Sequence, residues 1–292
     1  MKPIAEQRIF CVGAGAMSEA MIKGVLEARL LPAHQITICN RSKSARLDEL
    51  HQRYGVEISQ DKAAECAQAD LLLLAMKPFD LVTALQDVVP YLTPEQLVIS
   101  VAAGVSTQTI EECTGKAIPV IRAMPNTSSS VQASATALCA GRWATPEHVA
   151  LAQQLFSAIG ISVLVDEALM NAVTGLSGTG PAYFYYVAEA LLAGGQACGL
   201  PAETCRTLLV QTLYGTARML QETGKDPAEL RRQVTSPNGT TMAGIAVLDQ
   251  GDSKQAFQQA VQAATQRAEA MGLQVEGVFA RAQAGTERGS IR

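Results

Sequence analysis

Short apolar runs separated by amphipathic helical segments organise the first part of the chain. Strands are expected at residues 8–12 and 36–39. Two further runs, residues 70–76 and 97–101, are nearly continuously apolar, as is typical of parallel strands covered on both faces. Three weaker strand patterns follow at 117–121, 135–140 and 161–165. Helices are expected between the strands, including one at 44–54. Repeated strand–helix units predict an α/β, doubly wound sheet.

A helical period replaces the strand pattern after residue 165. Apolar side chains recur three or four positions apart, as at Phe184, Val187 and Leu191. Glycine and proline interrupt the period at 199–201, 224–227 and 251–253, and each interruption predicts the end of one helix and the start of the next. The second half of the chain is therefore predicted to be all-helical.

Composition narrows the class of protein. Charged residues are 17% of the 292 positions, below the roughly 25% of an average soluble protein, so part of the surface is expected to lie in a subunit interface. The net charge of −4 argues against a nucleic-acid ligand. The apolar run 71–76 is too short to span a membrane, and the polar residues 1–8 leave no room for a signal peptide.

The cysteines and histidines indicate the cellular compartment and whether a metal site is expected. The seven cysteines include no Cys-x-x-Cys pair and lie mostly in apolar segments, which is typical of reduced, buried thiols in a cytoplasmic protein. The three histidines are far apart in the sequence, and none belongs to a ligand-spaced motif. No metal site is expected.

A glycine-rich segment links the first strand to the first helix. In this setting Gly13 would permit a tight turn, and Gly15 would let the backbone approach a pyrophosphate. The start of the helix at Ala16, Met17 and Ser18 would supply free N–H groups. The segment therefore predicts a dinucleotide site, although a glycine pair can also simply turn a strand–helix corner.

The end of the second strand bears on the choice of nicotinamide cofactor. An NAD site is expected to carry a carboxylate there, but this strand ends in Asn40-Arg41-Ser42-Lys43. A guanidinium, a hydroxyl and an ammonium suit a 2′-phosphate, so NADPH is predicted over NADH. The alternative is a solvated basic loop.

The remaining cofactor contacts are expected where the other strands end. Three segments lie there, and each could instead only cap its strand: Ala75-Met76-Lys77-Pro78, Val101-Ala102-Ala103, and the stretch that contains Asn126.

Two segments of the helical half complete a pattern shared with a known family. They are Leu-Ser-Gly-Thr-Gly-Pro-Ala-Tyr at 176–183 and Val-Thr-Ser-Pro-Asn-Gly-Thr-Thr at 234–241. Together with the Ala-Met-Lys-Pro, Val-Ala-Ala-Gly-Val and Arg-Ala-Met-Pro-Asn-Thr segments, they resemble pyrroline-5-carboxylate reductases. The likeness runs in register from the first strand to about Gly251.

The resemblance implies an NADPH-binding Rossmann-like domain at 1–165 and a helical substrate-binding and dimerisation domain at 166–292. It implies reduction of 1-pyrroline-5-carboxylate to L-proline, the last step of proline biosynthesis, by a homodimer that can assemble further. It places the substrate at Ser177 and on a loop that contains Ser236, Gly239, Thr240 and Thr241.

We hypothesise that the Thr241 hydroxyl hydrogen-bonds the ring nitrogen of the imine. A protonated cyclic imine is already electrophilic, so hydride transfer needs orientation more than a strong acid. The alternative is that Ser236 and Thr240 merely cap a helix that begins beside them.

Three residues depart from the family pattern. Ser18 replaces a third glycine, which could loosen helix–strand packing or tighten a phosphate contact. Asn238 replaces a glycine, but asparagine tolerates positive φ, so the loop shape can survive. Lys62 replaces an asparagine near the adenosine, where it could add charge beside a 2′-phosphate or point into solvent.

Two other functions fit part of this pattern. One is a Rossmann-plus-helical reductase of β-hydroxyacids or acyclic imines, which a catalytic lysine would reveal in the pH dependence. The other is a non-catalytic NADPH sensor, which would bind the cofactor without reducing any imine.

Overall fold

The computed structural model describes residues 2–41 and 44–289. The chain forms two compact units. Met1–Thr179 and Gln262–Arg292 make up one, the sheet unit, and Gly180–Val261 make up the other, the helical unit. The domain boundary expected between residues 165 and 166, where the strand pattern gives way to a helical one, stays a prediction.

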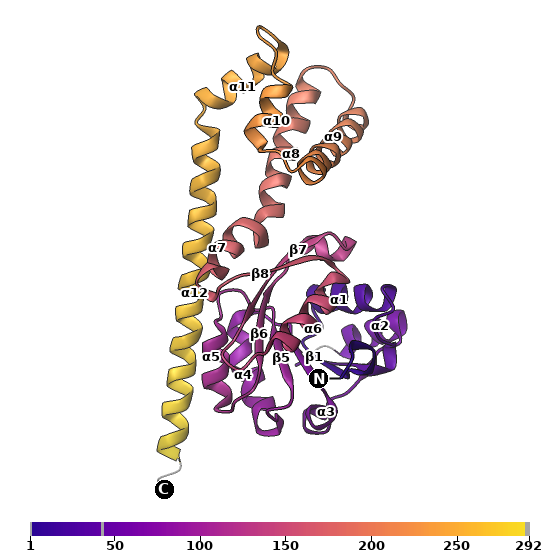
Figure 1. Cartoon of the computed structure of the whole chain (residues 1–292), viewed down its shortest axis with the longest axis vertical. Helices are drawn as coiled ribbons and strands as arrows, with labels where there is room; N and C mark the ends of the chain where they lie inside the picture. The colour runs from indigo at the N-terminus through magenta and orange to yellow at the C-terminus, as the bar shows by residue number, and fades with distance from the viewer. Residues whose placement is uncertain (1, 42–43, 290–292) are drawn as a thin grey trace. The chain divides into compact units, whose positions relative to one another are not determined.

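The sheet unit is built on an eight-stranded sheet, counted over its described residues, in the order β3-β2-β1-β4-β5-β6-β7-β8 (Figure 1). The strands are β1 (Ile9–Val12), β2 (Ile36–Cys39), β3 (Glu57–Ile58), β4 (Leu71–Leu74), β5 (Leu97–Ser100), β6 (Val120–Met124), β7 (Ser134–Ala140) and β8 (Gly160–Leu164). Strand order reverses between β1 and β4, both of which run parallel. The carboxyl ends of these strands are therefore the switch point at which such sheets bind ligands.

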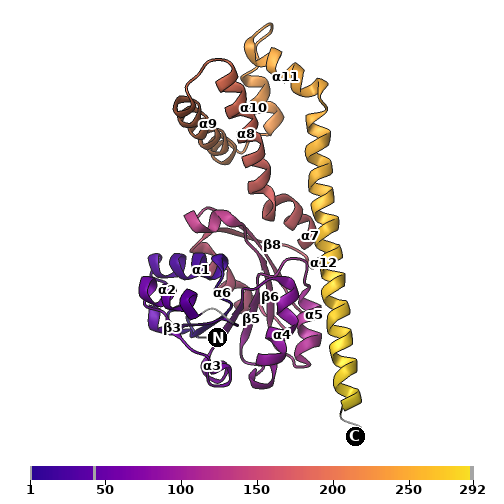
Figure 2. The same ribbon diagram turned by 180° about the vertical axis from the view of Figure 1, so that it is seen from behind.

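Helices cover both faces of this sheet (Figure 2). One face carries α1 (Ala16–Glu27), α2 (Ser44–Tyr54) and α6 (Pro146–Ser157). The other carries α3 (Lys62–Gln68), α4 (Pro78–Val88), α5 (Thr107–Thr114) and the later part of α12 (Ser253–Gly289). Each fully buried Leu, Ile or Phe in these layers stabilises the fold by about 1.5–3 kcal/mol.

Short helical turns complete the sheet unit. They are Ile4–Glu6, Ala33–Gln35, Val89–Tyr91, Thr127–Val131 and Glu167–Leu169, followed by α7 (Met170–Val173) and a π-helical turn at Thr174–Gly178. Single π turns are frequent at functional sites.

Most of the predicted elements of this unit are confirmed, with three differences. The strand expected at 117–121 begins at Val120, because Pro119 has no N–H to donate to a ladder. The two-residue edge strand β3 was not predicted. β7 runs antiparallel to β6, because only the short turn Thr127–Val131 connects them, and a parallel pair needs a long crossover.

The helical unit contains α8 (Gly180–Ala197), α9 (Ala202–Thr223), α10 (Pro227–Gln233), α11 (Thr240–Gln250) and the first residues of α12. The predicted interruptions are confirmed: Gly224 ends α9 with φ 61°, and the Asp226 carboxylate caps α10 by accepting from Ala228 N at 2.8 Å. Large apolar side chains stay exposed, among them Phe184 (65%), Tyr186 (71%) and Val247 (67%). None of the described helices is both long and apolar enough to cross a membrane.

Candidate cofactor and active site

Two adjoining cavities lie at the carboxyl end of the sheet. The larger, of about 790 Å³, is lined by the segments that follow β1, β4, β5 and β6. The smaller, of about 290 Å³, lies between the end of β2, α3 and α4. Gly13, Asn40, Met76 and Asp80 line both, so the two cavities form one groove at the switch point of the sheet.

Gly13 makes the turn at the base of this groove. Its φ is +105°, and a Cβ atom there would lie 2.5 Å from the carbonyl oxygen of Ala75. Its N–H donates to the Cys39 carbonyl at 3.0 Å, while Ala75 N donates to the Val12 carbonyl at 3.0 Å. The ends of β1, β2 and β4 are thus joined so closely that only glycine fits at this position.

The start of α1 faces the groove. Gly15 occupies the N-cap in an extended conformation, and no side chain of the described residues caps the helix. The first N–H groups of α1 are therefore open to an anion. Ser18 is fully buried, and its hydroxyl donates to the Gly13 carbonyl at 2.5 Å. Ser18 therefore tightens the glycine loop and offers no surface to a phosphate.

Arg46, which was not predicted, clamps the glycine loop from α2. Its Nε donates to the Ala14 carbonyl at 3.2 Å, and its guanidinium pairs with Glu19 of α1. Glu19 also accepts from Arg53 at 2.8 Å and Tyr54 at 3.0 Å. The hydrogen bond from Arg46 holds the pKa of the Glu19 carboxyl below its ordinary value, although burial opposes this. Residues 27 positions apart meet here only because α1 and α2 pack side by side.

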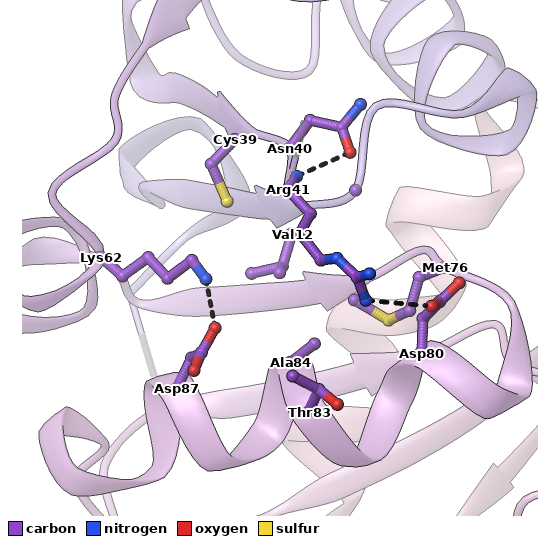
Figure 3. Close-up of a pocket in the computed structure, with 11 residues that line it drawn as sticks. Val12, Cys39, Asn40, Arg41, Lys62, Met76, Asp80, Thr83, Ala84 and Asp87 are labelled. Carbon is purple, nitrogen blue, oxygen red and sulfur yellow. Dashed lines mark hydrogen bonds and ion pairs between the residues drawn. The ribbon is translucent and has the colours of Figure 1, made fainter. Parts of the chain in front are cut away.

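Charged side chains line the smaller cavity (Figure 3). Lys62 points into it and pairs with Asp87, with Nζ and Oδ2 2.5 Å apart. Arg41 pairs more loosely with Asp80, with Nη1 and Oδ1 3.6 Å apart. Cys39 lies at the end of β2, and burial raises the pKa of its thiol to about 11. The thiol is therefore neutral and does not repel an anion in this cavity.

The π turn contacts the end of β6, the residues that follow it and β7 at one side of the larger cavity. The Asn126 side chain donates to the Ser177 carbonyl at 3.2 Å, and the Ser177 hydroxyl donates to the Ala135 carbonyl at 3.1 Å. Gly178 packs on Met124 so closely that a Cβ atom would lie 2.4 Å from its Cε. These contacts fix the segment that leads into α8.

An ion pair joins the buried Arg122 of β6 to the partly exposed Glu167. Arg122, 2% exposed, donates to Glu167 at 2.6 Å and to Asn171 at 3.1 Å. Glu167 also accepts from the Thr107 hydroxyl at 2.7 Å. Burial raises the pKa of the Glu167 carboxyl, but the hydrogen bonds from Thr107 and Arg122 outweigh it, so the pKa lies below its ordinary value.

The loop at 236–241 lies in the helical unit and ends at the start of α11. Asn238 has φ 57°, so its replacement of a glycine keeps the left-handed conformation as expected. Gly239 is the N-cap of α11, and no side chain of the described residues caps this helix. The capping role considered for Ser236 and Thr240 is therefore wrong, and the first N–H groups of α11 are left for another acceptor.

The structure gathers most of the predicted cofactor residues around the groove. Those that line it are Gly13, Gly15, Ala16, Met17, Asn40, Arg41, Lys62, Ala75, Met76, Lys77, Val101 and Asn126. Four others line neither cavity: Ser18, Pro78, Ala102 and Ala103. Ser42 and Lys43 lie outside the described residues.

Asp80 and Asp87 of α4 also line the groove without having been predicted. Their spacing of seven residues, two turns on one helix face, was the available signal. No group of three or more His, Cys, Asp or Glu side chains in the described part of the chain could hold a metal ion.

Comparison with known proteins agrees with this architecture. A family profile described as pyrroline-5-carboxylate reductase dimerisation matches residues 167–271, and one described as NADP oxidoreductase coenzyme F420-dependent matches residues 8–104. Pyrroline-5-carboxylate reductase 1 of Bacillus spizizenii is 39% identical over 277 residues, covering 94% of this chain and 93% of the relative.

Solved structures extend the likeness to the fold. A pyrroline-5-carboxylate reductase from Coxiella burnetii superposes with a TM-score of 0.82 at 37% identity, covering 91% of this chain and 98% of that one. The pyrroline carboxylate reductase of Plasmodium falciparum, solved with NADP bound, gives 0.83 at 25% identity, covering 92% and 99%. The chain therefore belongs to the pyrroline-5-carboxylate reductase family.

Proposed function

We propose that this chain reduces 1-pyrroline-5-carboxylate to L-proline with hydride from NADPH. The observation that carries the proposal is identity of 39% over 94% of the chain to a protein of that name, in a fold whose groove suits a dinucleotide. The nicotinamide supplies the hydride when the cofactor is bound.

The residues of the groove fit such a cofactor. Gly15 lines the larger cavity and leaves no side chain between the backbone and a pyrophosphate, and the uncapped start of α1 offers N–H donors at Ala16 and Met17. Arg41 and Lys62 supply positive charge to the smaller cavity. No Asp or Glu occurs between Glu27 and Asp48, so the end of β2 offers no carboxylate to a ribose hydroxyl. These features support NADPH over NADH.

The loop at 236–241 would orient the substrate. The uncapped N–H groups at the start of α11 would bind the substrate carboxylate. The Thr241 hydroxyl would hydrogen-bond the ring nitrogen and hold the adjacent carbon in place. We also propose substrate contacts at Ser177, Ser236, Gly239 and Thr240.

Assembly forms the third part of the proposal. Residues 167–271 match a dimerisation profile, and exposed apolar side chains such as Phe184 and Val247 suit burial against a second copy. We propose a homodimer formed through the helical unit, with further assembly of dimers. We also propose that the protein is located in the cytoplasm.

The direct test follows oxidation of NADPH and of NADH, separately, with 1-pyrroline-5-carboxylate and purified protein. We expect turnover with both and a higher kcat/KM with NADPH. Thr241→Ala should lower kcat roughly 100-fold, and Thr241→Ser should restore much of it. Thr216→Ala is the matched control, because within the described residues that hydroxyl donates to the Thr212 carbonyl of its own helix α9. Cofactor binding without imine reduction would reject the proposal.

A further inference from the structure

Two cations of the described residues line the smaller cavity, and each is paired with a carboxylate of α4. Figure 3 shows Lys62 and Arg41 directed toward Asp87 and Asp80. The two carboxylates are seven residues apart, so they project from one face of α4. Among the described residues that line this cavity, the two positive side chains are therefore matched by two negative ones.

A 2′-phosphate and a 2′-hydroxyl differ in whether they need the two cations of this cavity. A phosphate monoester carries about 1.5–2 negative charges at neutral pH, so it must draw on Lys62 and Arg41, and it must do so in competition with Asp87 and Asp80. A neutral ribose hydroxyl needs neither cation. On this argument the α4 carboxylates would weaken binding of NADPH and would not weaken binding of NADH.

We propose that Lys62 is the second cation of the 2′-phosphate site and that Asp87, acting through Lys62, sets how strongly the enzyme prefers NADPH to NADH. The proposal rests on the groove being the cofactor site of the proposed function. It adds that the preference is moderated by the Asp87 carboxylate, which lies beyond the cofactor segments predicted from the sequence.

Geometry makes the Lys62–Asp87 pair the stronger of the two. Lys62 is 27% exposed and its Nζ lies 2.5 Å from Asp87, whereas Arg41 is 75% exposed and lies 3.6 Å from Asp80. A short, partly shielded pair is screened less by salt and water than a long, exposed one. Both pairs are exposed enough to contribute little to folding, so substitutions here should leave the protein folded.

The test measures binding of two cofactor fragments to the full chain by titration calorimetry: 2′,5′-ADP, which carries the 2′-phosphate, and 5′-AMP, which lacks it. Lys62→Met should weaken 2′,5′-ADP binding about tenfold, since it removes one charge-assisted contact. Asp87→Asn should tighten it about two- to fivefold, the release of one partly exposed ion pair. Binding of 5′-AMP should change less than about twofold in both.

Two controls separate this contact from a general charge effect. Asp70→Asn changes the net charge equally at the opposite end of β4, where Asp70 pairs with Lys2 at 2.6 Å, and it should leave both ligands unaffected. In the double variant Lys62→Met/Asp87→Asn the gain from Asp87→Asn should vanish, because Asp87 acts through Lys62.

The inference is overturned if Asp87→Asn still tightens 2′,5′-ADP binding when Lys62 is absent. It is also overturned if Lys62→Met weakens the binding of 2′,5′-ADP and of 5′-AMP equally. Because neither fragment carries a nicotinamide, these results are independent of catalysis. A wild-type protein that shows the expected binding pattern but reduces no imine would overturn the proposed function alone.

Discussion

Gly13 and Gly15 lie two residues apart in one loop, yet the structure predicts opposite consequences for their replacement by alanine. At Gly13 the φ of +105° costs an L-residue about 1–2 kcal/mol. The new Cβ would also lie 2.5 Å from the Ala75 carbonyl oxygen, which belongs to the backbone and cannot rotate away. We expect Gly13→Ala to lower the free energy of unfolding by roughly 2–4 kcal/mol.

At Gly15 the backbone is extended, with φ −80° and ψ −175°, and the nearest atom to an added Cβ lies 4.0 Å away. Alanine there costs only the loss of a good N-cap residue, about 0.5 kcal/mol. The residue lines the larger cavity, so the methyl group would stand where a pyrophosphate approaches the backbone. We expect Gly15→Ala to fold normally and to bind NADPH at least about tenfold more weakly.

Thermal unfolding followed by circular dichroism, combined with a fluorescence titration of NADPH, separates the two effects. Gly13→Ala should lower Tm by roughly 4–10 °C, and Gly15→Ala should leave Tm within about 2 °C of wild type. The reasoning is refuted if Gly15→Ala is the destabilised variant, or if it binds NADPH as tightly as wild type.

Three further substitutions test other parts of the structure. Ser18→Ala should cost about 1–2 kcal/mol of stability, because the Gly13 carbonyl loses its buried donor; an unchanged urea midpoint would contradict this. Asn238→Gly should keep turnover, whereas Asn238→Val, with a β-branched residue at φ 57°, should lower it in the imine assay; equal activities would show that the loop conformation is unimportant. Glu167→Gln should reveal a pH-dependent contribution to stability: because the folded pKa of this carboxyl is lowered, its contribution is full above pH ~4.5 and is lost as pH falls through the folded pKa. The difference in Tm between wild type and Glu167→Gln should therefore shrink below pH ~4.5, and a constant difference down to pH ~3 would rule this out.

Local patterns determined most of the secondary structure. The strand at 36–39 and the helix at 44–54 have the predicted bounds, and Gly224 and Asp226 end and start helices as expected. Such features depend on the period of apolar residues and on the backbone preferences of glycine and the capping side chains, all of which are readable within a few residues.

The sequence by itself also determined the family, the two-part architecture and most of the groove, because a Rossmann sheet brings the ends of its strands to one edge wherever the intervening helices lie. Only the tertiary structure decided how the charges there are paired. Lys62 meets Asp87 across 25 residues, Arg46 reaches Glu19 across 27, and Arg122 reaches Glu167 across 45. Ser18, read as a possible phosphate contact, is turned to the Gly13 carbonyl. These contacts depend on how helices pack on the two faces of the sheet, and long-range packing leaves no periodic signal in the chain.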